Sequence, residues 1–168
     1  MELDWSYLLK SMLVDIVVLF VLNALLALSA PEVIPYTRED IFNSSEISWG
    51  ARTLVEELFW SSFFIGYFMS LYITNGVRFD LLGSKVDPPE WYRHQIPYLR
   101  RFPRNLFLRS LFIGIIALFL FFPVSCIICE ILALESLTYW DFVVFKGFYS
   151  ALIGAPLGLL IRIVALGD

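Results

Sequence analysis

The stretch LFIGIIALFLFFPVSCIIC, residues 111–129, contains no charged residue and decides the structural class of this chain. A helix needs about 20 mostly apolar residues to cross the hydrocarbon core of a bilayer. This run has that length, whereas a surface helix of a soluble protein would alternate apolar and charged positions along it. The stretch therefore predicts a membrane-spanning helix.

Three further stretches, residues 12–30, 54–74 and 142–166, have the same apolar character. The chain of 168 residues is 59% hydrophobic and 17% charged, while soluble domains are roughly 45–50% apolar and about 25% charged. We therefore expect an all-α membrane protein in which residues 1–168 form one membrane domain, a four-transmembrane-helix bundle.

Basic residues concentrate between the second and third predicted spans, in residues 75–110. Short loops rich in Lys and Arg stay on the cytoplasmic side, so this loop and both termini are expected to be cytoplasmic. We expect a protein integral to a membrane, the cytoplasmic (inner) membrane of a bacterium. The single basic cluster lies between two spans, so no nucleic-acid partner is expected.

The two halves of the chain resemble each other. LKSMLVDIVVLFV, residues 9–21, matches LRSLFIGIIALFL, residues 108–120, and SFFIG at 62–66 is echoed by SALIG at 150–154. The pattern predicts two similar helical hairpins related by an axis along the membrane normal. Such repeats occur in transporters and equally in purely structural bundles.

Ionisable residues inside the predicted spans are costly and each needs a reason. Asp15 and Arg162 fall near the cytoplasmic ends of the first and fourth spans, where they could pair. Four others gather toward the outer side. These charges either form an ion- or substrate-binding site or mark helix ends from which long side chains reach the interface. The binding candidates are Glu56, Glu57, Glu130, Lys146, Asp15 and Arg162.

Three residues are candidates for helix packing or for a partner interface. Gly154 and Gly158 have the spacing that lets two helices approach closely in a membrane. Asn23 is the one strongly polar side chain predicted near the middle of a span, where it would form an interhelical hydrogen bond.

The predicted cytoplasmic loop interleaves aromatic and basic residues, a pattern that suits the lipid headgroup layer. The alternative is a docking surface for another protein. The expected contacts with anionic lipid headgroups are Arg93, Arg100, Arg101, Arg104 and Trp91.

Cys126 and Cys129 form a C-x-x-C pair at the outer end of the third span. Their apolar surroundings and the neighbouring Glu130 disfavour a reactive thiolate, so we expect them to pack structurally. No motif for catalysis, for a metal or for a cofactor is found in the sequence, and an enzyme is the least supported class.

Two functions remain open. In the first, the chain is an accessory, assembly or binding subunit of a membrane complex and packs against a larger membrane protein. In the second, it is a small homo-oligomeric transporter or channel for an ion or small solute, which uses the outer cluster of acids and Lys146. Because four helices leave little room for a solute path, the first is favoured.

Overall fold

The computed structural model describes residues 5–28, 54–83, 102–131 and 139–166. These residues form four helices: α1 (Trp5–Leu28), α2 (Leu54–Leu82), α4 (Leu106–Ile131) and α5 (Tyr139–Ala165). The described part of the chain is thus all-helical, as expected from the sequence. Pro123 and Pro156 lie inside α4 and α5.

Three of these helices are long and apolar enough to cross a membrane: α1 over Tyr7–Leu28, α4, and α5 over Trp140–Ala165. This finding indicates an integral membrane protein. The second predicted span is not among the three. The reason lies in its composition, because α2 carries Glu56 and Glu57 in its first turn and serines, tyrosines and a tryptophan along its apolar part.

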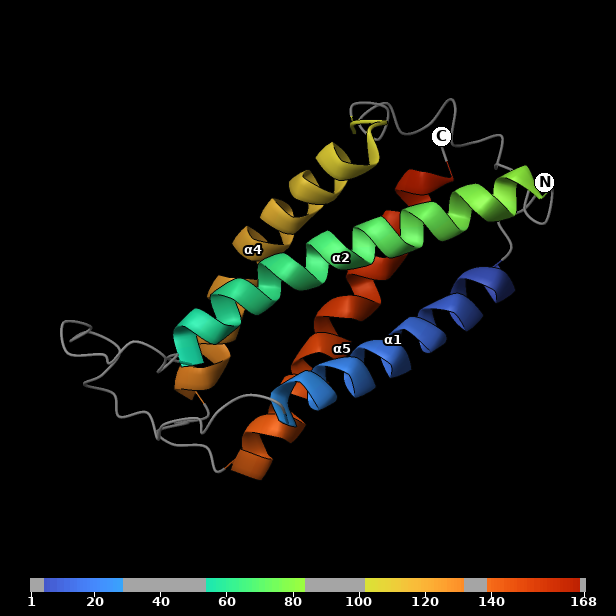
Figure 1. Cartoon of the computed structure of the whole chain (residues 1–168). Helices are drawn as coiled ribbons and strands as arrows, with labels where there is room; N and C mark the ends of the chain where they lie inside the picture. Colours follow the sequence, from blue (N-terminus) through green and yellow to red (C-terminus); the bar gives the residue numbers. More distant parts are fainter. Residues whose placement is uncertain (1–4, 29–53, 84–101, 132–138, 167–168) are drawn as a thin grey trace.

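Successive helices run in opposite directions (Figure 1). The start of α1, the end of α2, the start of α4 and the end of α5 lie at one end of the bundle. A hydrogen bond fixes part of this end, since the hydroxyl of Tyr7 donates to Asp80 over 2.8 Å. The end that holds residues 82 and 106 is called the loop end below, and the end that holds residues 28 and 54 is called the far end.

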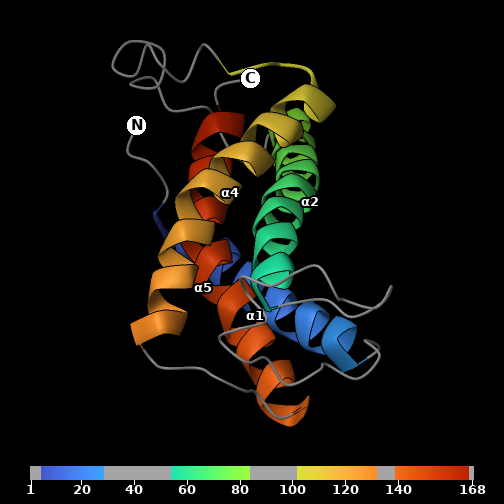
Figure 2. The same ribbon diagram turned by 90° about the vertical axis from the view of Figure 1, so that its left-hand side faces the viewer.

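The helices do not pack chiefly on their neighbours in the sequence. The extensive contacts join α2 with α4 and α1 with α5, and a smaller contact joins α2 with α5. Figures 1 and 2 show α5 crossing behind α2, between α1 and α4. The two predicted hairpins are therefore not compact units, because each helix packs chiefly on a helix of the other half.

This packing nevertheless has the pattern of the predicted repeat. The repeat makes α1 equivalent to α4, and α2 equivalent to α5. The α1–α5 contact is then equivalent to the α4–α2 contact, and the α2–α5 contact lies on the two-fold axis. The registers also agree. Gly66 approaches Ala117 on α4, and its repeat equivalent Gly154 approaches Leu19 on α1. The repeat alignment pairs Ala117 with Val18, the neighbour of Leu19.

The ends of α2 and α4 differ from the predicted spans. The second predicted span ends at residue 74, but Asn75 and Gly76 lie inside α2, and the helix continues to Leu82. Tertiary contacts explain the difference, because Val77 is buried and the guanidinium of Arg78 donates to the carbonyl of Arg104 over 2.7 Å. At the start of α4, the amide of Leu108 donates to Oδ1 of Asn105, a typical N-cap.

Candidate functional site

A buried ion pair joins α5 to α1 near the loop end. Arg162 Nη1 lies 2.5 Å from Asp15 Oδ2, and both side chains are less than a tenth exposed. Gly158 makes room for this pair, since a Cβ at that position would lie 3.2 Å from Asp15 Oδ2. The two residues that the sequence placed at the same depth are therefore in direct contact.

A second ion pair joins α5 to α2 near the far end. Lys146 Nζ bonds to Glu57 Oε1, and about 15% of each side chain is exposed. Ser61 donates a further hydrogen bond to the same carboxylate oxygen over 3.1 Å. The Phe142 ring, one turn earlier on α5, has its centroid 5.8 Å from Nζ. The carboxylate of Glu57 thus accepts hydrogen bonds from both Lys146 and Ser61.

The other predicted site residues have varied positions. Glu56 and Glu130 are exposed on α2 and on the last turn of α4. Gly154 and Gly158 face α1 within the same chain. Arg104 is exposed just before α4, where its carbonyl accepts from Arg78. Trp91, Arg93, Arg100 and Arg101 lie outside the described residues.

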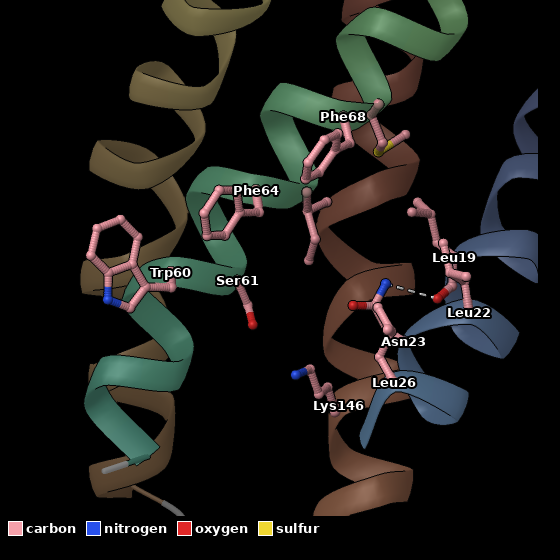
Figure 3. Close-up of a pocket in the computed structure, with 11 residues that line it drawn as sticks. Leu19, Leu22, Asn23, Leu26, Trp60, Ser61, Phe64, Phe68 and Lys146 are labelled. Carbon is pink, nitrogen blue, oxygen red and sulfur yellow. Dashed lines mark hydrogen bonds between the residues drawn. The ribbon is translucent and has the colours of Figure 1, made fainter. Parts of the chain in front are cut away.

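A groove of about 450 Å³ opens between α1 and α2, with α5 behind it (Figure 3). The α1 wall is aliphatic and the α2 wall is largely aromatic. Toward the far end the lining becomes polar, with Asn23, Ser61 and Lys146. The residues that line the groove are Leu19, Leu22, Asn23, Leu26, Trp60, Ser61, Phe64, Ile65, Phe68, Met69 and Lys146.

Asn23 is the most buried polar side chain of the groove, with 8% of its surface exposed. Its amide nitrogen donates to the carbonyl of Leu19, one turn back in α1, over 3.0 Å. In Figure 3 its oxygen points away from α1, into the space between the helices. The interhelical hydrogen bond predicted for Asn23 is thus replaced by a bond within its own helix, which leaves Oδ1 as an acceptor that faces the groove.

Two polar features were missed by the sequence analysis. Arg109, counted there as a loop residue, is 1% exposed in the first turn of α4, and its Nε donates to the carbonyl of Pro103 over 2.9 Å. A cluster of three hydroxyls also joins α2, α5 and α4. Tyr149 lies 2.6 Å from Ser62 and 3.1 Å from Ser125, oxygen to oxygen. Arg109 could have been placed from the sequence, because the repeat aligns it with Lys10 and Lys10 lies at the start of a predicted helix.

The described residues include no group of three or more His, Cys, Asp and Glu side chains arranged to hold a metal ion. Cys126 and Cys129 are free thiols of intermediate exposure, one turn apart on α4. The candidate site therefore consists of the groove and the two ion pairs on α5.

Comparisons of this chain with protein-family models, with curated proteins and with solved structures give no match.

Proposed function

We propose that this protein is an accessory or binding subunit of a membrane complex, with four membrane-crossing helices and both termini on the cytoplasmic side. In this proposal α2 crosses the bilayer with the other three helices. Its direction, opposite to those of α1 and α4, and its length of 29 residues support that assignment. The membrane is proposed to be the cytoplasmic membrane of a bacterium, and the basic residues around α2 and α4 to contact anionic headgroups.

The observation that carries the proposal is the outward face of α2. Among the four described helices, α2 alone falls short of the apolar character needed to span a membrane by itself, yet it exposes a stripe of aromatic rings. Large rigid rings of this kind are enriched where proteins contact one another. The stripe, called the aromatic stripe below, consists of Trp60, Phe64, Phe68, Tyr72 and Phe79, which are 43–71% exposed.

Three of the five rings of the aromatic stripe stack in a row. The Trp60 and Phe64 rings stack with centroids 5.7 Å apart, and those of Phe64 and Phe68 with centroids 5.9 Å apart. The outward face of α1, in contrast, exposes aliphatic side chains such as Leu13, Val17 and Val21. We infer that α1 faces lipid and that the aromatic stripe faces a larger membrane protein.

The charges favour binding over transport by one protomer. Lys146 and Arg162 are each paired with a carboxylate, and they lie about 24 Å apart along α5 at 1.5 Å per residue. Apart from Asp15, Arg109 and Arg162, the buried polar side chains of the described residues are Asn23 and hydroxyls. This arrangement supplies no chain of ionisable groups along which an ion or proton would pass.

The test is co-purification from native membrane in a gentle detergent. We expect the native chain to bring down a larger membrane protein in fixed ratio, and the double variant Tyr72→Leu/Phe79→Leu to lose most of it. The matched control is Phe107→Leu/Phe119→Leu, which removes two equally exposed rings from α4 and should retain the partner. A chain that elutes only as a homo-oligomer, or equal loss from both variants, would refute the proposed surface.

A transporter or channel is the second candidate, because Lys146 lines the groove while bonded to Glu57. That function requires ion or solute flux through liposomes that contain the purified protein, and flux that Glu57→Gln abolishes without unfolding the chain. Our proposal expects no flux above that of empty liposomes. Flux that Glu57→Gln removes would replace the subunit assignment with transport.

A further inference from the structure

Helix α5 differs from the two other helices that are long and apolar enough to cross a membrane. It is the least apolar of the three, and 56% of its most apolar stretch is buried inside the bundle, against 22% for α1 and for α4. Its spanning segment, Trp140–Ala165, contains two cations, Lys146 and Arg162. Because a charged side chain inside a span is costly unless it is paired, we expect α5 to depend on its neighbours more than α1 and α4 do.

Both cations of α5 pair with carboxylates from the first half of the chain, which is synthesised before it. Arg162 pairs with Asp15 of α1, and Lys146 pairs with Glu57 of α2. Both cations are largely buried, so neither extends its long stem to the polar surface. The two positive charges of the α5 span are therefore neutralised by the first half, one by each of its helices.

The repeat indicates that an ion pair is not required for packing alone. The α2–α4 contact is equivalent to the α1–α5 contact and is at least as extensive. The alignment of the halves places Thr74 at the position of Arg162, and Gly114 at the position of Asp15. Helices of this bundle therefore pack closely without charges at these positions. The ion pairs meet a requirement of α5 itself, namely the presence of two cations in its span.

We propose that Asp15 and Glu57 are the docking sites through which α5 enters the membrane and is retained in it. Helices α1 and α2 are made first and present the two carboxylates. Helix α5 then crosses the bilayer by pairing Arg162 and Lys146 with them, and its crossing is the step that closes the bundle. This inference rests on the membrane-crossing arrangement proposed above, and adds the condition under which that arrangement forms.

The side of the membrane on which the carboxyl terminus lies reports whether α5 has crossed. The experiment fuses the full chain either to alkaline phosphatase, whose disulfides form only outside the cytoplasm, or to green fluorescent protein, which becomes fluorescent only inside it. Both fusions are expressed in a bacterium, and each signal is divided by the amount of newly synthesised, pulse-labelled chain. For the native chain we expect fluorescence and little phosphatase activity.

Two double variants break both ion pairs but differ in the charges that they leave behind. Asp15→Leu/Glu57→Leu leaves both cations of α5 without these partners, and should give a severalfold rise in phosphatase activity with a matching loss of fluorescence. Lys146→Leu/Arg162→Met removes the cations and should keep the native side. Combining all four substitutions should restore it. Composition alone predicts no such loss, because Asp15→Leu/Glu57→Leu makes α1 and α2 more apolar.

The matched control is Glu56→Leu/Glu130→Leu, which removes two exposed carboxylates from α2 and α4 and changes the net charge equally. It should keep the native side. Equal signals from the native chain and from Asp15→Leu/Glu57→Leu would overturn the inference, and so would equal shifts from the two variants that break the ion pairs. Because the side is read shortly after synthesis, a variant whose bundle later unfolds remains informative.

The inference and the proposed function can fail separately. A native chain whose carboxyl terminus lies outside would overturn the proposed orientation, and the dependence of α5 on the two carboxylates is then read from the opposite change, a gain of fluorescence in the variant that lacks them. Loss of the partner protein from Tyr72→Leu/Phe79→Leu is measured in a different experiment and does not bear on the crossing of α5.

Discussion

Replacing Arg162 with methionine is expected to destabilise the folded protein by about 3–5 kcal/mol, the range found when one partner of a buried ion pair is removed. Arg162→Met leaves the carboxylate of Asp15 buried, with its cationic partner 2.5 Å away removed. The contact between α1 and α5 should open first, because this pair joins those two helices. The measurement is unfolding by SDS in mixed micelles, followed by far-ultraviolet circular dichroism.

Removing both charges should cost much less. Asp15→Leu/Arg162→Met leaves no uncompensated charge, and buried ion pairs can often be replaced by apolar residues at little cost or with a gain. Arg104→Met, which removes an exposed arginine, is the matched control and should stay within about 0.5 kcal/mol of the native protein. If the single and double variants unfold at the same SDS fraction, the pair does not act as described.

Replacing Gly66 with alanine is expected to have the second large effect, although alanine favours helices. A Cβ at Gly66 would lie 2.7 Å from the Cβ of Ala117 and 3.0 Å from the Cα of Gly114. The second of these is a backbone atom of α4, so α2 and α4 must move apart. Overpacking of this kind costs about 1–3 kcal/mol, which exceeds the gain of about 1 kcal/mol in helix propensity.

Alanine substitutions at two other glycines, Gly76 and Gly154, give reference values for the effect of Gly66→Ala on stability. Gly76 has no atom within 4 Å of the Cβ position, so Gly76→Ala should stabilise the protein by up to about 1 kcal/mol. At Gly154 the nearest atom is the terminal methyl Cδ1 of Leu19, which can rotate away, so Gly154→Ala should fall between the two. The expected order of stability, measured by the same SDS titration, is Gly76→Ala, then Gly154→Ala, then Gly66→Ala. A Gly66→Ala protein as stable as Gly76→Ala would contradict the close approach of α2 and α4.

The contrast between Gly66 and Gly154 shows a limit of motif reading. The spacing of Gly154 and Gly158 drew attention to α5, while Gly66, which approaches the α4 backbone more closely, has no second glycine at that spacing, only Ser62 and Ser70. The spacing of small residues within one helix indicates that another helix can approach closely. It does not report which helix approaches or whether the neighbouring atom can move.

The pairing of charges was partly predictable. Asp15 and Arg162 were placed at similar depth because residue position along an apolar helix gives depth directly. Lys146 was grouped with Glu56, Glu57 and Glu130 on the outer side, and only the arrangement of α2, α4 and α5 shows that it pairs with Glu57. The groove was not predicted, because it depends on α1 and α2 lying side by side without extensive contact.

The sequence by itself predicted a helical chain with four membrane spans, and three of the described helices are long and apolar enough to cross a membrane. Those properties depend on local composition and length, since a bilayer requires long apolar helices with internally satisfied backbones. It also carried the repeat, visible in residues 9–21 and 108–120. Only the tertiary structure decided that α1 packs on α5 and α2 on α4, that Arg109 is buried, and that Asn23 faces a groove. These features arise from side-chain contacts between segments far apart in the chain, and helices of similar apolar composition do not specify their neighbours until their small, aromatic and charged residues are brought together.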